Sequence, residues 1–125
     1  MQVERLDHLV LTVASIERTV QFYSRVLGMK AVTFGAGRTA LLFGDQKINL
    51  HEVNKEFEPK AQAPTPGSAD LCFITKTAIP DVIRHVTESG LTIEEGPVKR
   101  TGAIGDILSV YLRDPDGNLI EISAY

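Results

Sequence analysis

The sequence of 125 residues contains a single cysteine, Cys72, and no tryptophan. One cysteine cannot form an internal disulfide, which excludes the class of small disulfide-stapled secreted domains. Long apolar runs are also missing. The longest, Leu9–Ala14, is interrupted by Thr12 and is far shorter than the roughly 18 residues of a membrane-spanning helix. We therefore expect no membrane partner.

Basic clusters are scarce as well. The chain has 13 Lys and Arg residues against 16 Asp and Glu residues, a formal net charge of −3. Its longest basic tract is the pair Lys99-Arg100, which argues against a protein that binds nucleic acid. The first eight residues carry charges where a signal peptide has an apolar core. We expect a cytoplasmic protein.

An internal repeat is the most informative feature that the sequence does contain. His8–Val13 and Asp70–Thr75 both have the alternation of a strand, and they begin 62 residues apart (70 − 8). Each is followed by a helical pattern that ends at a glycine, Gly28 in the first half and Gly90 in the second, again 62 residues apart (90 − 28). Ser15 fits the N-cap of the first helix.

Three further strands follow each predicted helix. In the first half they cover residues 31–34, 39–43 and 47–53, and in the second half 92–94, 107–113 and 118–124. The second half holds extra residues, which we assign to a glycine-containing loop at 96–106. We predict an α+β fold in which two βαβββ modules form a cupped mixed sheet with the helices outside. The single domain 1–125 comprises module 1 (about 4–56), a linker (57–67) and module 2 (68–125).

The repeated βαβββ pattern resembles the vicinal oxygen chelate superfamily, which includes glyoxalase I, extradiol dioxygenases, fosfomycin-resistance thiol transferases and bleomycin-binding proteins. The residues that carry the resemblance are Asp7–Val13, Phe22–Met29 and Arg113–Glu121. More narrowly, the segments 49–52, 55–60, 70–73, 94–98 and 100–103 look like those of the glyoxalase domain-containing protein five subgroup, which has virulence-associated bacterial members.

The resemblance implies that metal ligands come from the first and last strands of each module. Those positions are occupied by His8, Asn49, Asp70 and Glu121. Imidazole and carboxylate ligands suit Ni, Zn, Mn, Co or Fe. Asp70 stands where histidine is the commonest residue of the superfamily, and it either binds the metal or pairs with a neighbouring group. Asn49 stands where glyoxalase I has a glutamate, so water replaces this ligand or the position is empty.

His51 shares a strand face with Asn49, two residues further along. A β-bulge at this point would bring the imidazole to the metal and complete a set of two histidines and two carboxylates. Without a bulge, His51 is a substrate contact, a general base or an ordinary hydrogen-bonded histidine.

Three further residues are candidates for binding a substrate, as is Asn49. Arg100 suits a carboxylate or phosphate, with a solvated loop arginine as the alternative. Tyr111 lies on a predicted strand and suits a bound oxyanion, unless it is a core residue. Cys72 shares the strand face of Asp70, although no neighbouring residue activates it as a nucleophile, and a structural thiol is its alternative.

The resemblance implies a divalent-metal-dependent lyase or isomerase of the glyoxalase type, acting on a small molecule with two adjacent oxygens through an enediolate. Glu121 is then the group that moves the proton, with His51 as a second catalytic candidate. The alternatives are an Fe(II) dioxygenase or a thiol transferase on the same scaffold, and a metal-free protein that sequesters a small ligand. The resemblance also implies a homodimer.

Overall fold

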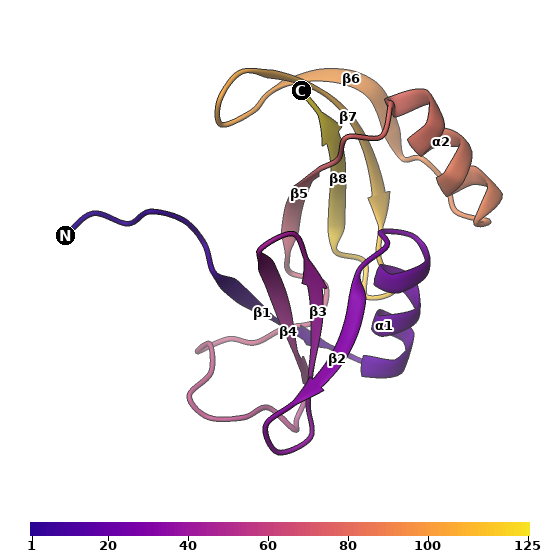
Figure 1. Cartoon of the computed structure of the whole chain (residues 1–125). Helices are drawn as coiled ribbons and strands as arrows, with labels where there is room; N and C mark the ends of the chain where they lie inside the picture. The colour runs from indigo at the N-terminus through magenta and orange to yellow at the C-terminus, as the bar shows by residue number, and fades with distance from the viewer. The chain divides into compact units, whose positions relative to one another are not determined.

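The computed structural model describes residues 1–125 and divides them into two compact units, Met1–Gly67 and Ser68–Tyr125. Each unit holds one four-stranded sheet and one helix (Figure 1). The element order strand, helix, three strands occurs twice, as the sequence repeat predicts. The predicted α+β class with two βαβββ modules is therefore confirmed.

The first unit arranges its strands in the order β1-β4-β3-β2, with β1 and β4 parallel and the other neighbours antiparallel. Helix α1 contacts β2, β3 and β4. The bounds of its elements are β1 His8–Val13, α1 Ile16–Arg25, β2 Lys30–Phe34, β3 Arg38–Phe43 and β4 Gln46–Glu52. The predicted strands agree with these bounds within one residue.

Helix α1 begins and ends where its sequence predicts. The side chain of Ser15 accepts a hydrogen bond from the Arg18 backbone N–H at 3.2 Å, which confirms the predicted N-cap. Gly28 follows the helix with φ +68°, a conformation that favours glycine. Phe22 and Tyr23 of the helix are buried, as are Leu41 and Ile48 of the sheet. This core covers one face of the sheet, and the alternating residues Asn49 and His51 lie on the other face.

The second unit repeats the arrangement with the order β5-β8-β7-β6, in which β5 and β8 are parallel. Helix α2 contacts β7 and β8. The core residues between them include Val82, Val86, Val110 and Ile120. The bounds are β5 Asp70–Ile74, α2 Ile79–Glu88, β6 Glu95–Thr101, β7 Asp106–Arg113 and β8 Leu119–Ala124.

Strand β6 differs from the sequence prediction. Residues 92–94 form no strand, and most of the loop predicted at 96–106 is strand β6. Gly96 and Pro97 do not indicate a strand in the sequence, because both residue types are uncommon inside a sheet. The structure places them at the edge strand, where the pairing register with β7 shifts between Glu95 and Val98. Such a bulge accommodates a proline that cannot donate to its neighbour.

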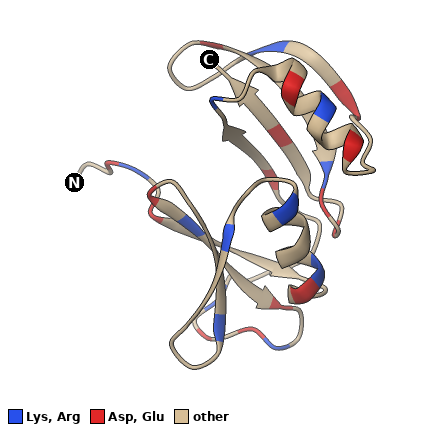
Figure 2. Cartoon of the chain, turned by 45° about the vertical axis from the view of Figure 1, so that its right-hand side comes forward, with Lys and Arg blue, Asp and Glu red and all other residues tan.

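Charged residues lie on several elements of each unit rather than on one (Figure 2). Several form exposed ion pairs, such as Arg113 with Glu94 at 3.0 Å and Lys99 with Asp106 at 3.0 Å. Exposed pairs of this kind contribute only about 0–1 kcal/mol each. The two apolar cores are therefore the main source of stability. Neither ten-residue helix meets the length and hydropathy that a membrane span requires.

Candidate functional site

The candidate site residues lie on the sheet face opposite the helix in each unit. Strand residues alternate between faces, so Asn49 and His51 point away from buried Ile48 and Leu50. In the second unit, Glu121 likewise points away from buried Ile120 and Ile122. The repeat therefore places both sets of candidates on the equivalent face of their own sheet.

His8 is a half-exposed side chain with an acidic neighbour. Its Nδ1 lies 2.8 Å from Asp7 Oδ2. The hydrogen bond from His8 is the largest cause that lowers the pKa of the Asp7 carboxyl. A carboxylate that engages one ring nitrogen orients the imidazole and leaves its other nitrogen for a ligand. The Asp7 contact thus engages one ring nitrogen of His8.

His51 occupies a different environment from His8. It is 7% exposed, and its ring packs edge-on against Phe57 of the linker with 5.6 Å between ring centroids. Arg38 lies over the same Phe57 ring at 4.5 Å. With Thr12 and Lys60, His51 also lines a small cavity of about 240 Å³ under the linker.

The bulge that would bring His51 toward the other candidates is absent. Strand β4 pairs with β1 in continuous register from Lys47 to Glu52, and with β3 from Gln46 to Leu50. His51 lies opposite Thr12, four residues beyond His8 on β1. Four strand residues span about 13 Å, so His8 and His51 do not converge within their unit. Asn49 lies opposite Val10, and its buried Oδ1 has no hydrogen-bond partner.

Glu121 is held by two serines of the second unit. Ser109 donates to Glu121 Oε1 at 2.7 Å, and Ser123 lies 3.4 Å from the same oxygen. Ser109 and Ser123 are fully buried and lie 2.7 Å from each other. The carboxylate is therefore fixed at one oxygen by groups that solvent cannot replace.

Glu121 also lines a cavity of about 380 Å³ that contains Cys72, Arg100 and Tyr111. Arg100 Nε donates to Tyr111 Oη at 3.0 Å, and its Nη2 donates to Glu95 at 3.2 Å. Burial is the largest cause that raises the pKa of the Tyr111 phenol, while the hydrogen bond from Arg100 opposes the shift. The phenol therefore stays protonated at neutral pH. Four of the residues singled out from the sequence thus share one cavity.

Cys72 and Asp70 lie on the neighbouring strand β5. Cys72 is directly opposite Glu121, and its Sγ lies 3.3 Å from Ser123 Oγ. Burial and the negative charges of Glu121 and Asp70 raise the pKa of the Cys72 thiol, with burial the largest cause. Cys72 is thus a neutral thiol rather than an activated nucleophile. Asp70 is exposed and lies opposite Leu119.

The donor set fits a divalent metal in its chemistry, since imidazole and carboxylate oxygen are common ligands. No group of three or more His, Cys, Asp or Glu side chains that could hold a metal is present in the chain. The orienting contacts Asp7–His8 and Ser109–Glu121 match those that surround metal ligands. His8 and Glu121 thus each have an orienting hydrogen-bond partner within their own unit.

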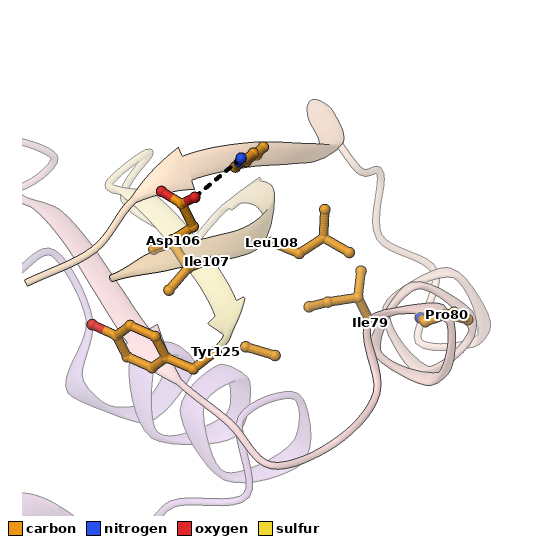
Figure 3. Close-up of a pocket in the computed structure, with 8 residues that line it drawn as sticks. Ile79, Pro80, Asp106, Ile107, Leu108 and Tyr125 are labelled. Carbon is orange, nitrogen blue, oxygen red and sulfur yellow. Dashed lines mark ion pairs between the residues drawn. The ribbon is translucent and has the colours of Figure 1, made fainter. Parts of the chain in front are cut away.

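A second hollow of about 460 Å³ lies between the start of α2 and the end of the sheet in the second unit. Figure 3 shows Ile79 and Pro80 at one side of it and Tyr125 at the other. Lys99 and Asp106 form an ion pair at its rim. Its lining is apolar apart from this pair and the Tyr125 phenol, and none of the candidate site residues lies in it.

Sequence reasoning missed the supporting residues of the site. Ser109 precedes Tyr111 by two positions, and Ser123 follows Glu121 by two, so both share a strand face with a predicted site residue. This parity is a usable signal. Nothing in the sequence indicates that Phe57 of the linker covers His51.

Comparison with protein families gives a match to the Glyoxalase/Bleomycin resistance protein/Dioxygenase superfamily over residues 5–122. The virulence protein STM3117 of Salmonella typhimurium is 63% identical over 125 residues, covering 100% of this chain and 87% of that protein. The glyoxalase domain-containing protein RDO1 of Mycosarcoma maydis is 58% identical over 125 residues, covering 100% of this chain and 70% of its own length.

A solved structure of the integron cassette protein VCH_CASS1 from V. cholerae is 66% identical, with a TM-score of 0.98 over 100% of this chain and 98% of that one. A more distant relative, the metallothiol transferase FosB of Shouchella clausii, is 27% identical over 128 residues, covering 96% of this chain and 80% of that protein. The family match spans nearly all of the sequence, both repeats included. The chain belongs to the glyoxalase/bleomycin resistance protein/dioxygenase superfamily.

Proposed function

We propose that the protein is a divalent-metal-dependent enzyme of the glyoxalase type, a lyase or isomerase that acts on a small oxygenated metabolite or electrophile. The observation that carries this proposal is the Glu121 carboxylate. It is oriented by Ser109 and opens on a cavity that also holds Arg100 and Tyr111. An oriented carboxylate beside a phenol and a guanidinium suits proton transfer on an oxygen-rich substrate.

His8 and Glu121 are the proposed metal ligands, with Asp70 as a third candidate. The hydrogen bond between Asp7 and His8 and the one between Ser109 and Glu121 support this assignment, because ligands are commonly held by such contacts. The likeness to a metallothiol transferase also supports it. When bound, a divalent cation supplies Lewis-acid polarisation to a substrate with two neighbouring oxygens. We assign His51 to substrate contact, because its position four strand residues beyond His8 does not suit shared ligation.

The chain's own residues have separable parts in this proposal. Glu121 accepts a proton from the substrate carbon next to the carbonyl. It then returns this proton to the former carbonyl carbon. Tyr111, protonated at neutral pH, donates a hydrogen bond to a substrate oxygen. Arg100 is hydrogen-bonded to Tyr111 and keeps the phenol in place. Catalysis in this scheme depends on orientation as much as on basicity.

The test is activity after metal reconstitution. Protein stripped of metal and reloaded with Ni, Zn, Mn, Co or Fe is assayed for isomerisation of hemithioacetals and of other small α-hydroxycarbonyl compounds. The proposal predicts activity with at least one metal, a loss of at least about 100-fold in Glu121→Gln, and no change in Glu88→Gln on helix α2. Activity that is absent with every metal and substrate contradicts the proposal.

A metal-free binding protein is the second candidate, and one observation favours it. The chain gathers no group of three metal-ligating side chains, yet its 380 Å³ cavity holds polar groups suited to a small ligand. Ligand binding that survives thorough chelation, together with wild-type affinity in His8→Ala, distinguishes this candidate from the enzyme.

We also propose that the protein works as a homodimer in the cytoplasm, with a small molecule as its other partner. Light scattering coupled to size exclusion tests the dimer. A mass of twice 13.7 kDa agrees with it, whereas a monomer mass at micromolar concentration contradicts it.

A further inference from the structure

A continuous chain of hydrogen bonds connects two residues of the 380 Å³ cavity across one face of the sheet. It runs from Cys72 Sγ to Ser123 Oγ at 3.3 Å, from Ser123 to Ser109 Oγ at 2.7 Å, and from Ser109 to Glu121 Oε1 at 2.7 Å. We call these four residues the hydroxyl chain. Its two ends line the cavity, while its two serines are fully buried.

The shorter contact of Ser109 with Glu121, 2.7 Å against 3.4 Å for Ser123, and the number of hydrogens available together fix the direction of the hydroxyl chain. A carboxylate only accepts, and each serine hydroxyl has one hydrogen to give. Ser109 gives its hydrogen to Glu121, so Ser123 must donate in the short contact between the two serines. Ser123 then has no hydrogen left for Cys72, and the thiol donates to it. Every hydrogen in the hydroxyl chain thus points toward Glu121.

The distances and the available hydrogens also show which serine binds Glu121 more strongly. The contact of Ser123 with Glu121 Oε1 is 3.4 Å, near the limit for a hydrogen bond, and its hydrogen is already used on Ser109. Ser109 is therefore the direct donor, and Ser123 acts by orienting Ser109. Buried donors of this kind hold their acceptor more firmly than water does, because water cannot take their place.

We propose that Ser109 and Ser123 are positioning residues that hold the Glu121 carboxylate in one orientation, with Ser109 the stronger of the two. This inference rests on the proposed function only for its consequence in metal binding. The orientation itself depends only on contacts within the chain. Ser109→Ala removes the direct donor, whereas Ser123→Ala leaves it in place and removes only its orienting partner.

The closing experiment has a metal-free arm that tests the inference. The side-chain carboxyl ¹³C signal of Glu121 is recorded in protein labelled with ¹³C-glutamate and assigned with Glu121→Gln. Ser109→Ala is expected to move this signal the furthest, Ser123→Ala less, and the control Ser89→Ala not at all. Ser89 is a suitable control because its hydroxyl also makes a hydrogen bond, to the His85 carbonyl oxygen on helix α2.

A variant that keeps a donor separates orientation from packing. Ser109→Cys retains a weaker donor at the same position and is expected to give a shift between those of wild type and Ser109→Ala. An unmoved Glu121 signal in Ser109→Ala, or a larger shift in Ser123→Ala, overturns the inference whether or not the protein binds metal.

A second arm titrates the metal-free proteins with Co(II) and follows the visible absorption. Loss of the direct donor is expected to weaken Co(II) binding about 10–100-fold in Ser109→Ala, with a smaller loss in Ser123→Ala. Wild-type protein that binds no Co(II) contradicts the proposed function, and the carboxyl signal then tests the inference alone. Wild-type affinity in Ser109→Ala contradicts the inference.

Discussion

Arg100 on β6 reaches along the neighbouring strand to Tyr111, where its Nε donates to the phenol oxygen at 3.0 Å. Arg100 pairs in register with Ile107, four residues before Tyr111 on β7, so the contact is made by the length of the arginine side chain. Glu95 fixes the other end of the guanidinium. The result is a phenol held beside Glu121 by a cation that is itself anchored.

Removing this cation is expected to change the titration of Tyr111. The hydrogen bond from Arg100 lowers the phenol pKa against the larger effect of burial, so Arg100→Met is expected to raise that pKa further. The phenolate absorbance near 295 nm, with Tyr111→Phe as the reference for the other tyrosines, reports the change. A pKa of Tyr111 that falls in Arg100→Met contradicts this role of the guanidinium.

Cys72 is expected to react slowly with thiol reagents at neutral pH. Burial raises its pKa, and the reactive thiolate is therefore scarce until the pH exceeds the ordinary range of a cysteine. The chain has one cysteine, so the rate with iodoacetamide reports this residue alone. A rate that is already maximal at pH 7 would mean that Cys72 is an activated thiolate.

The raised pKa of the Cys72 thiol also affects the stability of the folded protein at alkaline pH. As pH rises past the ordinary cysteine pKa, the unfolded chain loses its thiol proton before the folded chain does. The folded state then binds more protons, and its stability falls with rising pH. Urea unfolding between pH 8 and 10.5 is expected to show a smaller alkaline loss in Cys72→Ala than in wild type. Equal losses in the two proteins count against the raised pKa.

Asn118 joins the last hairpin to the start of β5. It is 1% exposed, its Oδ1 accepts from the Ala69 backbone at 2.8 Å, and its Nδ2 donates to Asp114 at 2.7 Å. Asn118→Ala leaves buried groups unpaired and is expected to reduce the free energy of unfolding by about 3 kcal/mol. The exposed turn residue Asp45 provides the control, with a change within about 0.5 kcal/mol for Asp45→Ala. Equal urea midpoints for the two variants contradict this role of Asn118.

Gly96 allows β6 to approach β7 closely. Its φ is +111°, and a Cβ there would lie 2.5 Å from the Ser109 carbonyl oxygen. Gly96→Ala is expected to cost more than about 2 kcal/mol of unfolding free energy. In Gly35→Ala the added Cβ meets nothing within 4 Å, so only the strain of positive φ remains, about 1 kcal/mol. Thermal unfolding of both variants measures the two losses of stability. A smaller loss in Gly96→Ala than in Gly35→Ala contradicts this role of Gly96.

Most of the fold could be predicted from the sequence because its signals are local. Alternation over His8–Val13, the Ser15 cap and the Gly28 terminator each act within a few residues, and the repeat supplies the same elements again. Strand β6 was not predicted because the interactions that form it are not local in the sequence. Its pairing with β7 depends on an edge position and a bulge, which are properties of the folded sheet.

The sequence indicates which residues line the cavity better than it indicates what their side chains contact. Family resemblance and strand parity indicate Glu121, Tyr111 and Cys72, and these line one cavity. Parity does not show that Ser109 donates to Glu121, because that contact depends on the register between β7 and β8. Nor does it show how the linker covers His51, since a proline-rich connector has no pattern that specifies what it packs against.

Metal content tests the central claim most directly. Protein purified without a polyhistidine tag is analysed by mass spectrometry of its metals, alongside His8→Ala and Glu121→Ala and the helix controls His85→Ala and Glu88→Ala. The proposed function predicts a stoichiometric divalent metal in wild type and in both controls, and its loss from His8→Ala and Glu121→Ala. Wild-type protein with no metal and none taken up on reconstitution would contradict the proposed function, as would full occupancy in Glu121→Ala.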